Sequence, residues 1–423
     1  MKILFLSNLY PPNVVGGYER LCADVAGAFV QREHEVAVLT STYGGKVQDY
    51  AGQTVHRSLT LLANADDIYS PFSADEAERA RINAANVAIL HATVAAEKPD
   101  VIFAWNLFFF DLSLLRALEG VGCRVVLMLT DNWLIAALDG DYIGRFFTEH
   151  VFGDKPFMPP AQPAAVTGWR RLLPSWIRAP AAPVVTPRFP LAEDAIFGAA
   201  FMRDLYADAG ISFRSHKVIH NGVRIADMPS SAFRDRRQFC DPGTVRLLFA
   251  GRLVDLKGVH TALEALAHLR RTEPDRQFHL TIVGDGQDRA YSERLKSLIA
   301  DLDVAPAITF QEPVREDTLF RLFNEHDIYL FPSLYEPFSL TLIHALACGI
   351  PTVASAVGGN VEIVTDRESG ILFRKGDAQD MGAGIMALVG DPELRHRVSA
   401  RARTFARGFT FERMVTEMER YLI

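Results

Sequence analysis

The chain has 423 residues, 49% hydrophobic and 22% charged, which is ordinary for a globular protein and too long for one core, so we expect two domains. Its formal net charge of -7 lacks the basic excess of a nucleic-acid-binding protein. No uncharged apolar run approaches the ~18 residues of a membrane span. We therefore expect a cytoplasmic protein, with contact at the inner face of the membrane left open. Four widely spaced cysteines argue against a zinc site or disulfide framework: Cys22, Cys123, Cys240 and Cys348.

The first half of the chain alternates short runs of β-branched residues with helical patterns. The first helix is expected to begin after Gly17, because Leu21, Val25 and Phe29 recur four residues apart and would form one buried stripe. A second helical pattern covers residues 85–96. Strands are expected at residues 3–7, 35–40, 101–105, 124–130, 183–186 and 217–220. This alternation predicts βαβ units and a parallel sheet.

The second half repeats this alternation. Strands are expected at residues 245–250, 279–283, 308–310, 328–331, 352–354 and 370–373, with a helix over 261–271. The polar, proline-containing stretch 224–243 is typical of a linker. We therefore expect two Rossmann-like, doubly wound α/β domains, residues 1–223 and 241–405. Residues 139–183 are rich in proline and aromatic side chains, fit neither pattern and are interpreted as an insertion on the first domain.

Two loops between a strand and a helix have residues suited to anions, at the sheet edge where open α/β sheets bind ligands. Gly16 and Gly17 precede the first helix, where glycines allow close approach and a helix N-terminus favours negative charge. Read alone, such a pair is more often a simple turn. Arg252 and Lys257 follow the strand 245–250, and a guanidinium with an ammonium suits a diphosphate. Two solvated charges are an equal alternative.

A third loop, after the strand 328–331, contains Glu336. A helix is expected from about Ser339 to Cys348, with Gly349 ending it. The free amides at its start would form an anion site: Ser339, Leu340 and Thr341. The Glu336 carboxylate would accept hydrogen bonds from sugar hydroxyls. For Glu336 alone, a favourable interaction with the helix dipole is the stronger interpretation.

In this order, the motifs resemble those of the retaining glycosyltransferases of family 4, which have the GT-B fold, and the resemblance covers nearly the whole chain. It rests on NLYPP at 8–12, GGYER at 16–20, VIHNGV at 218–223, AGRL at 250–253 and KG at 257–258. It continues with VGDG at 283–286, EPFSL at 336–340, GIPTVA at 349–354, GG at 358–359 and GILF at 370–373. Each motif is weak, but the ordered set is specific.

The resemblance implies two domains facing a cleft, a nucleotide-diphosphate sugar as donor and retention of the anomeric configuration. Arg252 and Lys257 would hold the diphosphate, and Glu336 the transferred sugar. Other implied donor contacts are Gly16, Gly17, Gly284, Pro313, Val314, Phe338, Ser339, Leu340, Thr341 and His344. No metal and no cofactor are expected, because cations and helix amides would hold the leaving-group charge. The last helix, residues 406–423, is implied to pack on the first domain.

Two positions depart from the family pattern. The family has a second glutamate eight residues after the first, where it contacts ribose, but this chain has His344, which puts ribose binding and nucleotide choice in doubt. After the strand 124–129, similar proteins often have a histidine, whereas this chain has Asp131. Asp131 would orient the acceptor hydroxyl or act as a weak base. Capping of the next helix is an equal alternative.

The leading hypothesis is therefore a glycosyltransferase with Glu336, Asp131, Arg252 and Lys257 as catalytic residues and a carbohydrate, lipid-linked or small-molecule acceptor. A non-catalytic nucleotide-sugar-binding subunit of a biosynthetic complex is the alternative, which His344 keeps open. A phosphorylase is a weaker option, because no pyridoxal-phosphate lysine is identified. For residues 220–221 we favour a hinge or structural role. For the phenylalanines at 108–110 we favour core packing or loop anchoring over an acceptor pocket.

Overall fold

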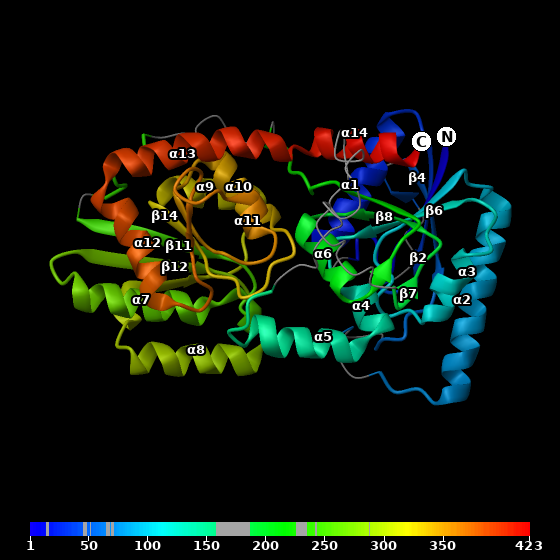
Figure 1. Ribbon diagram of the computed structural model, residues 1–423, viewed down its shortest axis with the longest axis horizontal. Helices are drawn as coiled ribbons and strands as arrows, with labels where there is room; N and C mark the ends of the chain where they lie inside the picture. Colours follow the sequence, from blue (N-terminus) through cyan, green and yellow to red (C-terminus); the bar gives the residue numbers. More distant parts are fainter. Residues whose placement is uncertain are drawn as a thin grey trace, which may run out of the picture. The chain divides into compact units, whose positions relative to one another are not determined.

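The computed structural model describes residues 1–13, 17–44, 49–50, 52–64, 68, 72–157, 187–225, 235–241, 243–286 and 288–423. The chain divides into two compact α/β units (Figure 1). The first comprises Met1–Val218 and Met418–Ile423, and the second comprises Ile219–Glu417. The strand expected at residues 183–186 lies outside the described residues, as does most of the stretch 139–183.

The described part of the first unit has an eight-stranded sheet in the order β10-β8-β6-β5-β1-β2-β4-β3. Its strands are β1 (Lys2–Leu6), β2 (Glu35–Ser41), β3 (Asp49–Tyr50), β4 (Gln53–Leu59), β5 (Val101–Ala104), β6 (Arg124–Leu129), β8 (Asp194–Phe197) and β10 (Ser215–Val218). Only β3 runs antiparallel to its neighbour within this described sheet. A small second sheet pairs β7 (Phe189–Pro190) with β9 (Ile211–Ser212). Every residue of β5 is buried, as expected for a parallel strand covered on both faces.

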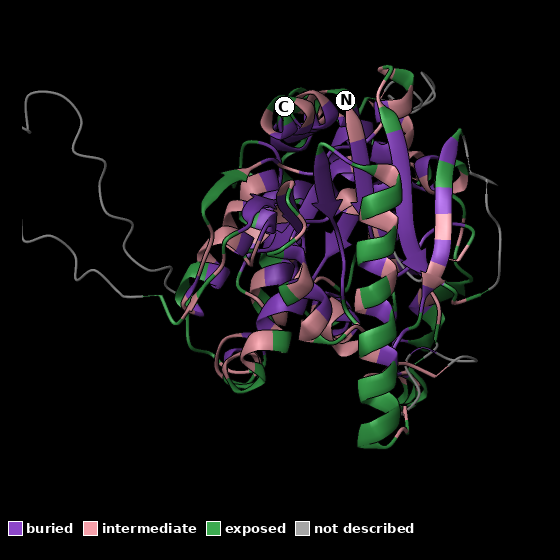
Figure 2. Ribbon diagram, turned by 90° about the vertical axis from the view of Figure 1, so that its right-hand side faces the viewer, coloured by how far each residue is buried: buried purple, intermediate pink, exposed green. Residues whose placement is uncertain are grey.

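The helices of this unit follow the hydrophobic pattern. They are α1 (Gly17–Gln31), α2 (Glu76–Glu97), α3 (Leu112–Leu118), α4 (Trp133–Leu138), α5 (Gly140–Phe146), a π-helical turn (Phe147–Val151) and α6 (Ala200–Asp208). The expected stripe on α1 is confirmed, since Leu21, Val25 and Phe29 are all buried. By contrast, α2 exposes most of its surface (Figure 2). Residues 140–151 are helical, so the beginning of the expected insertion is regular rather than irregular.

The second unit has a six-stranded sheet in which all described neighbours are parallel, in the order β13-β12-β11-β14-β15-β16. The strands are β11 (Thr244–Ala250), β12 (Gln277–Val283), β13 (Ile308–Gln311), β14 (Ile328–Phe331), β15 (Thr352–Ser355) and β16 (Ile371–Phe373). The helices are α7 (Val259–Thr272), α8 (Arg289–Asp301), α9 (Glu316–Glu325), α10 (Leu340–Cys348), α11 (Asn360–Ile363), α12 (Ala378–Gly390) and α13 (Pro392–Ala406). The last helix, α14 (Phe411–Leu422), begins in this unit, and its residues from Met418 onward belong to the first. Short 3-10 turns cover Asp255–Lys257, Ala305–Ala307 and Arg407–Phe409. None of the helices in the described ranges is long and apolar enough to cross a bilayer.

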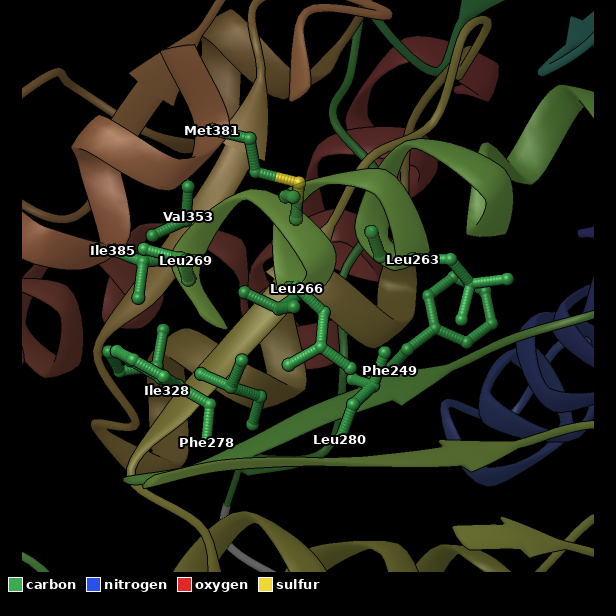
Figure 3. Close-up of a cluster of buried hydrophobic side chains, with 14 of the residues drawn as sticks. Phe249, Leu263, Leu266, Leu269, Phe278, Leu280, Ile328, Val353, Met381 and Ile385 are labelled. Carbon is green, nitrogen blue, oxygen red and sulfur yellow. The ribbon is translucent and has the colours of Figure 1, made fainter. Parts of the chain in front are cut away.

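The core of the second unit forms where α7 and α12 pack against the sheet. Phe249 of β11, Leu280 of β12, Leu266 of α7 and Ile385 of α12 belong to one buried cluster (Figure 3). Burying side chains of this size is worth about 1.5–3 kcal/mol each. The sheet is therefore a rigid base for the loops that leave its strands.

The strand order of each sheet reverses at one point. In the second unit, β12 and β13 lie to one side of β11, and β14, β15 and β16 lie to the other. In the first unit, the order turns between β1 and β5. Open α/β sheets bind ligands at the carboxyl ends of the strands flanking such a point. The loops after β11 and β14, and after β1 and β5, are therefore the places to look for chemistry.

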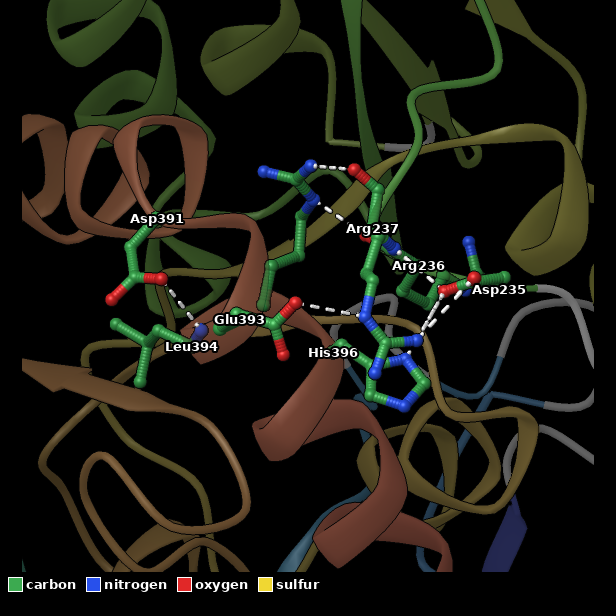
Figure 4. Close-up of polar contacts among 8 residues, drawn as sticks. Asp235, Arg236, Arg237, Asp391, Glu393, Leu394 and His396 are labelled. Carbon is green, nitrogen blue, oxygen red and sulfur yellow. Dashed lines mark hydrogen bonds and ion pairs between the residues drawn. The ribbon is translucent and has the colours of Figure 1, made fainter.

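Polar contacts fasten the beginning of the second unit to α13. The Arg395 Nε donates to the carbonyl of Arg236 at 2.6 Å, and Arg237 Nε donates to Glu393 Oε1 at 2.9 Å. Arg236 is itself buried and donates to the carbonyl of His326 at 2.8 Å. Figure 4 shows Arg236, Arg237 and Glu393 in this arrangement. These contacts fix the chain where it enters β11.

A buried carboxylate holds the edge of the first sheet together. The Asp194 Oδ2 accepts hydrogen bonds from Arg124 Nε and Arg214 Nη2, both at 2.7 Å, and Oδ1 accepts from Ser215 Oγ at 2.9 Å. Arg124 also donates to the carbonyl of Tyr421 at 2.7 Å. Burial alone would raise the pKa of Asp194, but these donors hold that pKa well below its usual range. One side chain thus links β6, β8, β10 and the end of α14.

The Asp194→Asn substitution is expected to lower the free energy of unfolding by about 3 kcal/mol at pH 7, because it leaves two guanidinium groups without their charge partner. Since the folded-state pKa is depressed, the wild-type advantage exists above the ordinary pKa and disappears as the pH falls below it. Urea unfolding at several pH values measures both effects. The control Glu149→Gln breaks the exposed pair with Lys155 and should change little. Equal effects of the two substitutions would contradict the assignment.

Candidate functional site

The loops after β11 and β14 meet in a buried ion pair. Lys257 Nζ lies 2.5 Å from Glu336 Oε2, and Ser333 Oγ lies 3.5 Å from the same oxygen. Glu336 is 6% exposed, so its charge requires a partner. The sequence placed both residues at this edge, and the structure brings them into direct contact.

Glycine makes this meeting of loops possible. Gly258 has φ +66°, and a Cβ there would lie 2.0 Å from the carbonyl oxygen of Pro332. Close by, the Leu334 amide donates to the carbonyl of Leu256 at 2.8 Å. The backbone of the β11 loop therefore lies directly on that of the β14 loop, with no room for a side chain between them.

Two further glycines close the site from the neighbouring strands. A Cβ on Gly359, after β15, would lie 2.2 Å from the Pro337 oxygen, and the Gly359 amide donates to the carbonyl of Glu336 at 2.9 Å. A Cβ on Gly284, after β12, would lie 2.0 Å from the carbonyl oxygen of Gly251. Gly284 thus supports the loop that begins at Gly251. This close backbone contact explains why the motif has glycine at position 284.

Arg252 differs from Lys257 in its surroundings. Its backbone is held between two cross-loop hydrogen bonds, Gly251 N to the Val283 oxygen at 2.9 Å and Leu253 N to the Asp285 oxygen at 3.1 Å. Its side chain is exposed and makes no hydrogen bond or ion pair with another residue in the described ranges. Within the described residues, the loop after β11 therefore has one guanidinium without a side-chain partner and one ammonium paired with a carboxylate.

The expected helix after Glu336 is confirmed. Ser339 is its N-cap and its side chain accepts from the Leu342 amide at 3.1 Å, while Gly349 ends the helix with φ +66°. Leu340 and Thr341 begin the first turn at the same edge of the sheet. The Ser339 hydroxyl oxygen accepts the cap hydrogen bond and keeps its own O–H as a donor.

Phe338 belongs to the packing of the unit rather than to an open surface. It is 7% exposed and stacks on His220, with ring centroids 5.2 Å apart and planes inclined by 12°. His220 Nε2 also lies 2.8 Å from Glu362 Oε2. Only the backbone of Phe338 is left to face a ligand. His220 in turn supports the loop that contains Glu336.

The corner between β13 and α10 contains a carboxylate that sequence reasoning missed. Pro313 and Val314 connect β13 to α9, and the first residue of α9, Glu316, places Oε1 3.1 Å from His344 Nε2. Burial lowers the pKa of His344 to about 4, so the imidazole beside this carboxylate is neutral at pH 7. The position at which the sequence lacks a glutamate therefore has one beside it.

In the first unit, the loop after β6 contains a carboxylate with altered acidity. Asp131 Oδ1 accepts from the Trp133 amide at 3.0 Å, a local hydrogen bond between residues two apart. The N-cap of α4 is Asn132, so Asp131 precedes the capping position rather than occupying it. Burial, with a smaller contribution from the charge of Glu19, raises the pKa of Asp131 to about 6. Glu19 is 6% exposed on the first turn of α1 and was not singled out from the sequence. Gly17 is the first residue of α1, and Gly16 lies outside the described residues.

Two family models match the chain. Residues 15–227 match Glycosyltransferase Family 4, and residues 234–405 match Glycosyl transferases group 1. A glycogen synthase of Mycobacterium tuberculosis is 28% identical over 414 residues, which are 95% of this chain and 89% of that protein. A D-inositol 3-phosphate glycosyltransferase of Acidothermus cellulolyticus is 36% identical over 206 residues, 47% of this chain and 46% of that protein.

Solved structures share the fold over the full length. Sucrose-phosphate synthase from Thermosynechococcus elongatus has a TM-score of 0.71 at 17% identity, covering 99% of this chain and 98% of that one. HepE of Anabaena in complex with UDP-glucose has a TM-score of 0.68 at 21% identity, covering 100% of this chain and 99% of that one. The expected two-domain GT-B fold is thereby confirmed.

The substitution Gly258→Ala is expected to lower the free energy of unfolding by about 3 kcal/mol, because left-handed backbone strain adds to a clash with the Pro332 carbonyl. Gly376→Ala is the matched control: φ is +69°, but a Cβ there has no atom within 4 Å, so only the strain of about 1–2 kcal/mol applies. Urea unfolding of the two variants measures the difference. Equal destabilisation would show that the close approach of the loops is not what requires glycine at position 258.

Proposed function

The chain belongs to glycosyltransferase family 4, and we propose that it transfers a sugar from a nucleotide-diphosphate sugar to an acceptor hydroxyl with retention of the anomeric configuration. The product would be a glycan or glycoconjugate. The observation that supports this most directly is the exposed Arg252 on the same loop as Lys257, which is paired with Glu336, at the point where the second sheet reverses its order. Since HepE of Anabaena has a solved complex with UDP-glucose, a uridine-diphosphate sugar is the first donor to test.

The two cations have different parts in this proposal. Arg252 binds the diphosphate through two parallel N–H donors, for which its side chain needs no rearrangement of another described residue. Lys257 contributes a point charge shared between Glu336 and the phosphate. The cations and the amides at the start of α10 stabilise the charge that develops on the leaving group, so the proposal requires no metal ion.

Glu336 recognises the transferred sugar. Its buried carboxylate accepts hydrogen bonds from sugar hydroxyls, and Lys257 fixes its orientation before the donor arrives. Glu316 would serve the ribose, because its side chain is 58% exposed while its carboxylate lies beside His344. In this chain a neutral imidazole on α10 and a carboxylate on α9 would together replace the single glutamate of the family.

Asp131 acts on the acceptor in the same proposal. Above pH 6 it is a carboxylate, which can accept the hydrogen bond of an acceptor hydroxyl and orient that oxygen. Its backbone contact with Trp133 keeps it in place for this role. The local hydrogen bond and acceptor binding are compatible, because Oδ1 accepts from the Trp133 amide and a carboxylate has a second oxygen.

A non-catalytic nucleotide-sugar-binding subunit remains the second candidate, because His344 departs from the family pattern. It predicts saturable donor binding with neither transfer nor slow hydrolysis of the donor. The proposed transferase predicts at least one of the two reactions.

Replacing Arg252 by alanine is expected to lower kcat/KM about 100-fold and to weaken donor binding, since a charge-assisted contact to the diphosphate is lost. Donor-induced thermal stabilisation and turnover with a panel of nucleotide sugars measure the two effects. Arg252→Lys should recover part of the binding, and Arg401→Ala, at an exposed position of α13, should change neither. If Arg252→Ala behaves like the Arg401 control, the proposed donor site is wrong.

The dependence of kcat/KM on pH is expected to rise through about pH 6 as Asp131 loses its proton. The groups that influence this proton include Glu19 on α1, and the hydroxyls of Tyr18 and Tyr206 lie close by. Stability should run the opposite way, because a raised pKa favours the folded state most below the ordinary pKa and least above pH 6. In Asp131→Asn the rise near pH 6 should be absent. A rise that persists in this variant would assign the proton to another group.

A further inference from the structure

A small apolar pocket lies at the carboxyl edge of the first sheet. Its walls are the loop after β5, residues 107–112, together with Leu115 of α3 and three residues of α4, Trp133, Ala136 and Ala137. Its volume is about 190 Å³. The loop follows one of the two strands at which this sheet reverses its order, which is where such sheets bind ligands. None of the functions assigned above uses this pocket.

We propose that the pocket binds an aromatic ring of the sugar acceptor, an inference that rests on the proposed transferase function. The size fits one ring, since an engineered apolar cavity of about 150 Å³ binds benzene. A sugar ring is a poor occupant, because each buried hydroxyl left without a partner costs about 1–3 kcal/mol. The acceptor class is therefore a hydroxyl compound with an aryl group.

The wall residues support an uncharged, aromatic occupant. Asp111 is the one charged residue among the described lining residues, and its carboxylate caps α3 by accepting from the Ser113 amide at 2.8 Å. Phe108 and Phe109 form a tilted pair with centroids 4.4 Å apart, and Phe110 and the Trp133 indole also line the pocket. Aromatic pairs contribute about 0.5–1.5 kcal/mol beyond the area they bury, which favours an aryl group over an alkyl chain.

The loop is held in a shape that leaves one phenylalanine at the surface. The Phe108 carbonyl accepts from Asn8 Nδ2 at 3.1 Å, and its amide donates to Asn106 Oδ1 at 2.8 Å. Phe109 and Phe110 pack against the small cluster of Leu9, Leu61 and Ile68, as expected from the sequence. Phe108 is 44% exposed and does not fit that expectation. Two buried asparagines thus fix the loop so that Phe108, although it contacts the Phe109 ring, keeps 44% of its surface exposed, and a ligand at this surface would cover it.

The backbone of the same loop is strained at Phe109. Phe109 has φ +71°, a conformation that costs an L-residue about 1–2 kcal/mol. Its carbonyl accepts from the Leu62 amide at 2.8 Å, which helps to hold the strained turn. Such strain persists where the surroundings enforce it, often at ligand sites.

The pocket is linked to the carboxylate that we assign to the acceptor. Trp133 forms one wall, and its amide donates to Asp131 Oδ1 at 3.0 Å. A single turn after β6 therefore supplies both the surface for the ring and the group for the hydroxyl. An acceptor bound in this way places its hydroxyl at Asp131 and its ring against Trp133.

The test compares three probes that differ only in the group attached to the same sugar: methyl, octyl and 4-nitrophenyl glucoside. The chain has four tryptophans, so 5-fluorotryptophan labelling gives a small set of fluorine NMR signals, and Trp133→Phe assigns the relevant one. Without donor present, the 4-nitrophenyl compound should bind at least tenfold more tightly than the methyl compound and shift the Trp133 signal. Equal binding of the two, or tighter binding of the octyl compound, would overturn the aromatic assignment.

A filling substitution gives the matched control. Ala137 is exposed on α4, so Ala137→Phe should fold normally, occupy the pocket and remove the tenfold preference. Ala88→Phe makes the same change on the exposed face of α2 and should keep it. A preference that survives in Ala137→Phe places the ring elsewhere. Thermal stabilisation by a uridine-diphosphate sugar on the same samples tests the donor site separately, so a failed pocket and a failed transferase proposal give different results.

Discussion

The second unit depends on the ion pair between Lys257 and Glu336, because it joins the two loops between which the sheet reverses its order. A carboxylate this deeply buried is costly without a partner, and the partner arrives from a different strand. The two loops reach each other only because Gly258 has no Cβ to meet the Pro332 carbonyl. The buried charge of Glu336 requires Lys257, and their contact requires glycine at position 258. These three motif residues therefore depend on one another.

Most of the fold could be read from the sequence, because continuous apolar runs coincide with buried parallel strands. The expected strands at 245–250 and 328–331 match β11 and β14 closely. Three strands of the first sheet were missed, β3, β4 and β8, and for β4 and β8 the reason is physical. Along β4, buried positions alternate with polar ones such as His56, so no apolar run marks it. The first residue of β8 is Asp194, whose charge is balanced by arginines far away in the sequence.

The candidate site was predictable to the extent that its residues lie in motifs. Arg252, Lys257 and Glu336 each follow a recognisable strand, so their common edge could be inferred before their contact was known. Glu316 could not be found this way, because its importance comes from contact with His344 on another helix. His344, which in the sequence appears only to replace the family's glutamate, thus lies beside a glutamate from another helix in the structure. Pairs of this kind leave no local signal.

Burial acts on both units by favouring the uncharged form of a titratable group, but with different consequences. It lowers the pKa of His344 to about 4 and raises the pKa of Asp131 to about 6. Between these values both groups are neutral. Above pH 6 Asp131 gains a charge, while His344 stays neutral. Of these two groups, only Asp131 changes its protonation state near neutral pH, and it lies in the first unit, where we place the acceptor. His344, at the position where we propose ribose binding, stays neutral.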